Sequence, residues 1–223
     1  MEVRIKNKEL LSTLDGFVSK LRSDSDYNNP KYRFFDPSDA ISKGKFYTSD
    51  KYLETVMARS DHSGFPTEHY SQPISQMSQK DQKWKDLEYR VKKEFPAEIG
   101  AHSSALFNYY PPGGFVGWHT NWNANAYQIL FTWSETGDGY FKYWDLEKKE
   151  VVTIPDVPGW QCRWYYFGLK NEPEHHCWHA AYTGCDRVTL AYKVFNGFEG
   201  KNDSQDILAQ NLRDQIIEDI ENE

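Results

Sequence analysis

The feature that most constrains the fold is a series of eight short runs, rich in β-branched and aromatic residues, between positions 103 and 196. Turn sequences such as "PPGG", "ETGDG" and "PDVPG" separate these runs. Short runs bounded by turn signals predict β-strands, and several in succession predict a sandwich or barrel. The chain is 39% hydrophobic and 16% aromatic, so it can bury a sizeable core.

Helices are predicted outside this region. Apolar residues recur at steps of three and four, the spacing of one helix face, in segments 7–22, 79–95 and 204–221. Pro96 is expected to end the second helix. The polar segment 23–76 carries turn signals, so we expect loops with short elements there, which is typical of a segment that covers a substrate.

These patterns together predict one domain over residues 1–223. Residues 1–102 would supply helices and loops that pack on a β core formed by residues 103–196. Residues 197–223 would form a C-terminal helix, which packs on the sheet or, as an alternative, mediates a homodimer.

Charge and cysteine content limit the class of protein. The net charge of −7 disfavours nucleic-acid binding without excluding it. The three cysteines fit neither a disulfide framework nor a four-cysteine zinc site, and they favour a reducing cytoplasm. The N-terminus lacks the apolar segment of a signal peptide, and no run approaches the roughly 18 apolar residues of a membrane span. We therefore expect a soluble, cytoplasmic protein with no membrane partner.

The stretch "FVGWHTNWN" places His119 and Asn121 two residues apart behind a turn. Alternate residues of a strand share a face, so we expect both side chains to point the same way. Sixty residues after His119 comes His179, and Arg187 follows eight residues later across the turn "TGCD". An antiparallel hairpin at this turn would bring His179 and Arg187 near each other.

The strand that begins at Arg187 is predicted to have one polar and one apolar face. The polar face carries Arg187, Thr189, Ala191 and Lys193, and the apolar face carries Val188, Leu190, Tyr192 and Val194. Two neutral imidazoles and one oxygen ligand leave coordination positions of an iron ion open for a bidentate oxo-acid and dioxygen. Arg187 would then hold the distal carboxylate with paired hydrogen bonds, and the adjacent Thr189 hydroxyl would add a third.

The other histidines leave alternatives. His176 could replace His179 as the second ligand, but His179 has the better spacing to Arg187. His62 and His69 lack metal-type spacing and are interpreted as surface residues. In the competing interpretation, His119 and His179 are hydrogen-bonded residues at strand ends and Arg187 is a solvated charge.

Taken in order, His119-x-Asn121, His179 and Arg187-x-Thr189 resemble the motif of the iron(II)/2-oxoglutarate-dependent oxygenase superfamily. The likeness spans residues 103–196 and implies a mainly β fold, a double-stranded β-helix or cupin-like jelly roll with flanking helices. It implies that His119, Asn121 and His179 bind iron(II). It also implies that Arg187 and Thr189 bind 2-oxoglutarate, with ascorbate as an activator.

A second likeness lies upstream. "FNYYPPGGFVGWH" is similar to a stretch of AlkB-type dealkylases, which implies that Asn108 and Tyr110 contact the oxo-acid. "RVTLAYK" resembles the Arg-x-Asn-Leu-Thr-Phe-Arg strand of that group, with Thr189 in place of its Asn and Lys193 in place of its second Arg. This resemblance implies that Lys193 also binds the oxo-acid. The short spacing from His179 to Arg187 is more like that of prolyl-hydroxylase-type members.

Asn121 departs from the family pattern, which usually has Asp. Its amide oxygen could bind the metal, which we prefer because Asn is long enough to reach it. Alternatively, a carboxylate from elsewhere, such as Asp145 or Glu135, fills the position, or water or halide occupies it. In the last alternative the iron site is lost.

The resemblance implies hydroxylation or oxidative demethylation of an unidentified substrate, with O2 consumed and 2-oxoglutarate decarboxylated to succinate. The substrate could be a protein side chain, a small molecule or an alkylated base. The rival expectation is a non-catalytic jelly-roll binding module.

Overall fold

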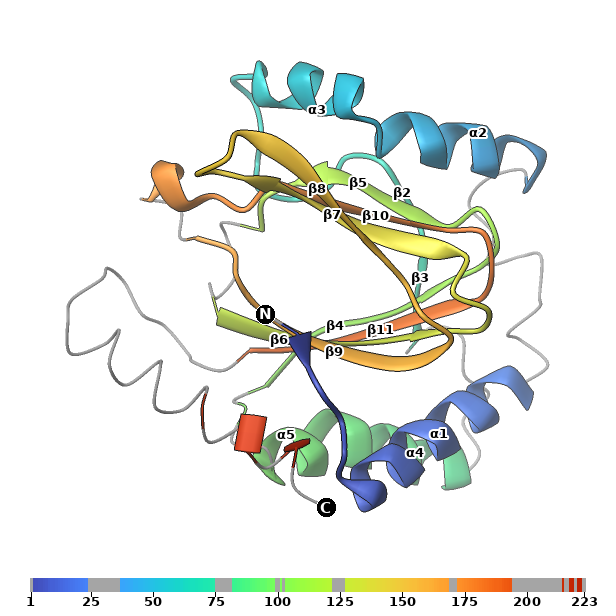
Figure 1. Cartoon of the computed structure of the whole chain (residues 1–223). Helices are drawn as coiled ribbons and strands as arrows, with labels where there is room; N and C mark the ends of the chain where they lie inside the picture. The colour runs from blue at the N-terminus through green and yellow to red at the C-terminus, as the bar shows by residue number, and fades with distance from the viewer. Residues whose placement is uncertain are drawn as a thin grey trace.

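Two antiparallel sheets pack face to face in the computed structural model, with helices on their outer faces (Figure 1). The structure describes residues 2–23, 37–74, 82–98, 101, 103–121, 127–168, 172–193, 214, 217, 218, 220 and 221. The larger sheet has the order β1 (Glu2–Val3), β9 (Gly159–Tyr166), β6 (Tyr127–Ser134), β11 (Arg187–Lys193), β4 (Ser103–Tyr110), β3 (Gln72–Pro73). The smaller sheet has the order β2 (His69–Tyr70), β5 (Phe115–His119), β10 (His179–Thr183), β7 (Gly139–Asp145), β8 (Glu150–Pro155).

The strand order is that of a jelly roll. Strands β4, β6, β9 and β11 lie in the larger sheet, while β5, β7, β8 and β10 lie in the smaller one. The chain therefore crosses repeatedly between two antiparallel sheets, as in other double-sheet jelly rolls. The eight predicted runs correspond to these eight strands, and the predicted mainly β, jelly-roll core with flanking helices is confirmed.

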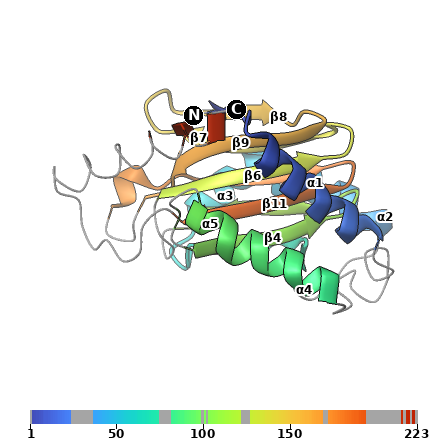
Figure 2. The same ribbon diagram turned by 90° about the horizontal axis from the view of Figure 1, so that it is seen from below.

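Helices cover the outer face of the larger sheet (Figure 2). They are α1 (Lys8–Ser23), α4 (Gln82–Tyr89), η3 (Arg90–Glu94) and α5 (Phe95–Glu98). Val188, Leu190 and Tyr192 of β11 are fully buried in a cluster shared with these helices. Tyr192 Oη also donates to the Val91 carbonyl at 3.0 Å. The predicted apolar face of this strand therefore packs on helices, which leaves its polar face to line the space between the sheets.

Pro96 does not end the second helix, contrary to expectation. It is the second residue of α5, and the preceding five residues, η3, form a π-helical turn. The Phe95 N–H donates to the carbonyl of Arg90, five residues earlier. A π turn changes the hydrogen-bond register of a helix, so the missing N–H of proline falls where the ladder is already shifted.

The segment 23–76, predicted as loops with short elements, contains two helices in its central part. Helices α2 (Pro37–Tyr47) and α3 (Asp50–Met57) lie over the smaller sheet (Figure 1). The Ser49 side chain caps α3 by accepting from the N–H of Tyr52, and Leu53 and Val56 are buried. Pro37 begins α2, a position that suits the fixed φ of proline.

The predicted C-terminal helix over 204–221 falls largely outside the described residues. Of those described, Ile220 is fully buried and Ile217 packs against the same core cluster. The carbonyl of Ile220 accepts from the N–H groups of Lys6 and Asn7 at 3.0 and 3.1 Å. Over the described residues, the longest apolar helical stretches fall short of what a bilayer crossing requires.

Candidate functional site

Two histidines meet across the smaller sheet. His119 ends β5 and His179 begins β10, and the two are direct partners in the strand register. Their ring centroids lie 4.1 Å apart, and each residue is 5% exposed. His179 is the histidine beside His119, whereas His176 precedes the strand and is half-buried.

A β-bulge orients His119. His179 pairs with His119, but Ala181 pairs with Val116, so β5 contains one extra residue. Gly117 lies within this bulge, and its N–H donates to the Glu68 carbonyl at 2.7 Å. A Cβ at Gly117 would lie 2.9 Å from that same oxygen. This close approach leaves room only for glycine. The bulge changes the direction in which the following side chains, including that of His119, point.

Hydrogen bonds define the tautomers of both rings. His119 Nδ1 lies 2.8 Å from the Gly117 carbonyl, and His179 Nδ1 lies 2.8 Å from the Cys177 carbonyl. A carbonyl only accepts, so each Nδ1 carries the proton and each Nε2 keeps its lone pair. Burial lowers the pKa of His119 well below its ordinary value and lowers that of His179 to about 4. Both rings are therefore neutral at pH 7, the form that binds metals.

Asn121 contacts this pair from a backbone conformation that the sequence did not indicate. The strand ends at His119, and Asn121 has φ 57°, in the left-handed region that Asn tolerates better than most residues. Its N–H donates to the Gly64 carbonyl at 2.7 Å. Its Nδ2 lies 3.2 Å from His179 Nε2, as the deduced tautomer requires. Strand alternation was thus the wrong reason for grouping Asn121 with the histidines.

The carboxylates considered as substitutes for Asn121 are engaged elsewhere. Asp145 accepts from the N–H groups of Glu147 and Lys148 in the β7–β8 turn. Glu135 pairs with Arg22 of α1. Among the residues that the structure describes, no three His, Cys, Asp or Glu side chains group as a metal site. The donors that converge here are therefore two imidazoles and one amide.

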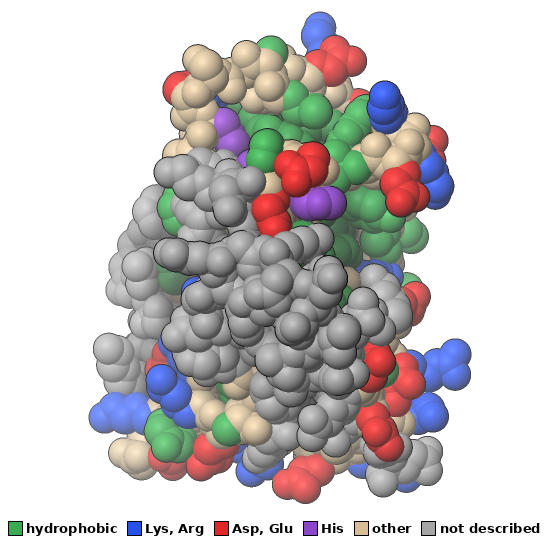
Figure 3. Space-filling model, turned by 90° about the vertical axis from the view of Figure 1, so that its left-hand side faces the viewer, with side chains coloured by type: hydrophobic (Ala, Val, Ile, Leu, Met, Phe, Trp, Pro, Cys, Tyr) green, Lys and Arg blue, Asp and Glu red, His purple; other side chains and the backbone are tan. Residues whose placement is uncertain are grey.

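His62, expected at the surface, is half-buried beside the site. Its Nε2 lies 3.0 Å from the hydroxyl of Thr120, the residue after His119, and its ring packs 4.5 Å from Trp178. Spacing along the sequence could not indicate this contact, because it forms where the segment after α3 packs against the end of β5. Figure 3 shows histidine side chains at the surface of one side of the molecule, near hydrophobic and acidic side chains. His69 is exposed, as expected.

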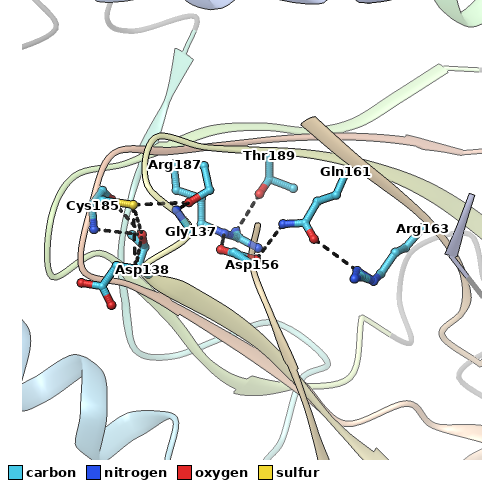
Figure 4. A network of polar contacts seen from close by, with 10 residues as sticks. Gly137, Asp138, Asp156, Gln161, Arg163, Cys185, Arg187 and Thr189 are labelled. Atoms are coloured by element: carbon cyan, nitrogen blue, oxygen red, sulfur yellow. Dashed lines mark hydrogen bonds and ion pairs between the residues drawn. The ribbon is translucent and has the colours of Figure 1, made fainter. Parts of the chain in front are cut away.

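Arg187 is buried, at 3% exposed, and forms a network with side chains from β9 and the loop before it (Figure 4). Its Nε donates to Asp156 Oδ2 at 2.8 Å, and its Nη1 donates to Thr189 Oγ1 at 2.8 Å. Gln161 Nε2 donates to the other oxygen of Asp156 at 3.0 Å. The interpretation of Arg187 as a solvated charge is therefore wrong. Sequence reasoning missed both Asp156 and Gln161.

Strand β4 brings Asn108 and Tyr110 next to this network. Tyr110 pairs with Arg187 and Asn108 with Thr189 in the register. The guanidinium lies 5.4 Å from the centre of the Tyr110 ring. Asn108 Nδ2 donates to Ser71 Oγ at 3.0 Å. Burial raises the pKa of Tyr110, so its hydroxyl remains a donor.

Lys193 is not part of this network. It ends β11, whereas Arg187 begins it, so the two lie roughly 20 Å apart along the strand. In the register Lys193 pairs with Ser103 and Gln128. The two cations on the polar face of β11 therefore cannot act on the same small group.

The histidines lie in the smaller sheet and Arg187 in the larger one, so β10 and β11 do not pair as the expected hairpin. Phe141 stacks on His179 at 5.6 Å and also lines the small cavity beside Arg187.

The buried imidazoles predict that the metal-free protein loses stability in mild acid. His179 titrates at about 4 in the folded chain, against roughly 6.5 unfolded. The unfolded state therefore binds more protons, and stability present above pH ~6.5 falls by about 3 kcal/mol as the pH drops to ~4. Urea unfolding in EDTA across this range measures the effect. His179→Gln should flatten the slope; an unchanged slope would contradict the prediction.

No protein-family model matches the sequence, and no curated protein matches it. Among solved structures, the chain is similar to a prolyl-4-hydroxylase from Pseudomonas putida (12% identity, TM-score 0.33, 71% of this chain and 88% of that one). It is also similar to a rice dioxygenase for auxin oxidation (13%, 0.35, 82% and 69%) and an Escherichia coli ribosomal oxygenase (15%, 0.33, 96% and 58%). These likenesses are remote, so the fold assignment rests on the strand order itself.

Proposed function

We propose that the protein is an iron(II)- and 2-oxoglutarate-dependent oxygenase. The observation that carries this proposal is the pair His119 and His179, each with its Nδ1 proton held by a carbonyl and its Nε2 unprotonated. Anchoring the Nδ1 proton in this way is how proteins prepare imidazoles for metals.

The donor set fits iron(II). Imidazole nitrogen and an amide oxygen both suit a divalent first-row ion, although a neutral amide binds it less tightly than a carboxylate. In this proposal His119, His179 and Asn121 hold the metal, and rotation of the Asn121 amide turns its oxygen toward it. Iron with 2-oxoglutarate and O2 would supply the oxidising power for hydroxylation or oxidative demethylation, releasing succinate.

The remaining residues would orient the oxo-acid and exclude water. Arg187 and Thr189 would hold the distal carboxylate, and Tyr110 and Asn108 on β4 would contact the rest of the oxo-acid. Lys193 would act only on a part of the ligand near its own end of β11. Phe141 and Phe167 pack against His179, and their rings would keep the metal environment dry.

The substrate class stays open among a protein side chain, a small molecule and an alkylated base. The exposed side of the histidine pair carries His62 and Trp178, whose rings pack together. A planar group could stack there. The net charge of −7 makes a nucleic-acid duplex the least favoured substrate.

The test is direct. Iron(II), 2-oxoglutarate and ascorbate are added anaerobically, and the weak visible charge-transfer band of a metal–oxo-acid chelate is recorded; succinate is then measured in air. Both signals are expected. Absence of both would reject the oxygenase and leave the jelly-roll binding module, for which ligand binding without succinate formation is the expected outcome.

Asn121→Asp is expected to tighten iron(II) binding by about tenfold or more, because a carboxylate replaces a neutral oxygen donor. Asp also tolerates the left-handed backbone at this position. Iron titration followed by intrinsic tryptophan fluorescence measures the change. Asn108→Asp, away from the histidines, serves as the matched control. Equal iron affinity in wild type and Asn121→Asp would exclude Asn121 as a ligand.

A further inference from the structure

Arg187 already holds a carboxylate supplied by the protein. The side chains of Arg187 and Asp156 are 4% and 3% exposed and form an ion pair at 2.8 Å. The Asp156 carboxylate packs directly against Gly139, where the Cβ of any other residue would lie only 2.6 Å from Asp156 Oδ2. Its N–H also donates to the Gly139 carbonyl at 2.9 Å. A ligand carboxylate can meet Arg187 only by sharing it with Asp156 or displacing it.

The space beside the pair is small. The cavity has a volume of about 20 Å³ and is lined by Leu130, Thr132, Phe141, Asp156, Gln161, Arg163, Tyr165 and Arg187. This is room for about one water molecule, and a carboxylate group is larger. Rotation of the Asp156 side chain would enlarge this space without moving its backbone, which β7 holds in place.

Two further polar groups line this cavity. Arg163 donates to Gln161 Oε1 at 3.3 Å, and no carboxylate in the described part of the chain lies within ion-pair distance of it. Tyr165 Oη is buried and has no hydrogen-bond partner among the residues that the structure describes. A buried polar atom without a partner is rare in folded proteins, so the Tyr165 hydroxyl calls for an explanation. The cavity holds two cations and one anion, so one positive charge is not balanced by its lining.

We propose that Asp156 is a specificity-determining residue that competes with the distal carboxylate of the oxo-acid for Arg187. Arg163 and Tyr165 are the additional contacts that the incoming carboxylate gains. The carboxylate binds between Arg163, Tyr165 Oη and the Nη groups of Arg187 once Asp156 turns aside. Because Asp156 competes for Arg187, the protein binds a dicarboxylate less tightly than an unpaired Arg187 would. The identity of the ligand as an oxo-acid rests on the proposed function, whereas the anion site rests on the cavity.

The test is isothermal titration calorimetry of the full chain in EDTA, with 2-oxoglutarate and 2-oxopentanoate as probes. The two differ only in the distal carboxylate. Asp156→Asn is expected to tighten 2-oxoglutarate binding by about tenfold or more, because the competing charge is removed while a hydrogen-bonding amide remains. Binding of 2-oxopentanoate should not change. Asp138→Asn, at an exposed aspartate of a neighbouring turn, is the control and should match wild type.

Arg163→Gln is expected to weaken 2-oxoglutarate binding by about tenfold, through loss of a charge-assisted hydrogen bond, and Tyr165→Phe by a smaller factor. Weaker or unchanged 2-oxoglutarate binding in Asp156→Asn overturns the proposal, as does tightening of both probes together. If Asp156→Asn fails to fold, Arg163→Gln decides: unchanged 2-oxoglutarate binding overturns the proposal, and tenfold loss supports it.

These outcomes separate the two proposals, because no iron is present. The variants could show the predicted order of affinities for 2-oxoglutarate in EDTA while the iron-loaded chain forms no succinate. That result would reject the oxygenase and support the anion site. Succinate formation together with unchanged 2-oxoglutarate binding in Asp156→Asn would support the oxygenase and reject the proposed anion site.

Discussion

His179→Ala is expected to remove iron-dependent succinate formation and the chelate band. Changing residues that merely orient a metal ligand already costs about 10–100-fold in affinity or activity, so loss of the ligand itself should exceed about 100-fold. His179 is also the residue that pairs with His119 and contacts Asn121, so no described side chain is placed to replace it. Bound iron, measured by mass spectrometry after gel filtration, should fall with activity.

His69→Ala is the matched control, since His69 is exposed at the short edge strand β2. It should retain full iron binding. If His179→Ala also retained its iron, the metal would have to lie elsewhere, and the proposed function would lose its main support. His119→Ala provides the symmetrical check and should behave as His179→Ala does.

The second large effect concerns stability. Arg187→Ala leaves the Asp156 carboxylate buried without its cation, and breaking a buried pair from one side costs about 3–5 kcal/mol. For a chain of this size the melting temperature should fall on the order of 10 °C. Differential scanning calorimetry and urea unfolding measure it. The paired change Arg187→Met with Asp156→Leu should recover most of the loss, because no charge is then left buried alone.

Arg59→Ala provides the control for this experiment. Arg59 and Asp61 form an ion pair with similar geometry, at 2.9 Å, but on the surface. Surface pairs contribute little to stability, so the melting temperature should stay near that of wild type. A drop as large as that of Arg187→Ala would mean that the effect of Arg187 does not come from burial of its pair.

Much of the fold could be predicted because local patterns agree with tertiary packing. The alternation in β11 separates Arg187 and Thr189 from Val188 and Leu190, and the structure keeps this separation by placing helices on the apolar side. Helices α2 and α3 were missed because their polar composition hid short apolar spacings, of which Leu53 and Val56 are an example. The π turn before Pro96 has no signal in single-residue propensities.

The site was predictable only in part, for a related reason. Each recognised residue lies on a strand or directly after one, where spacing along the chain indicates direction in space. Asp156, Gln161 and His62 reach the site from other strands, loops or turns, and their contacts depend on how segments distant in sequence pack together. Asn121 shows the converse, since its contact with His179 depends on a left-handed residue and not on a strand.

That left-handed backbone at Asn121 bears on how this site could evolve. Glycine, asparagine and aspartate enter this region more readily than most residues, so few residue types suit this position well. The codons of asparagine and aspartate differ by a single base. A lineage could therefore pass between an amide and a carboxylate in one mutational step, leaving the backbone intact and altering only the charge presented to the two histidines.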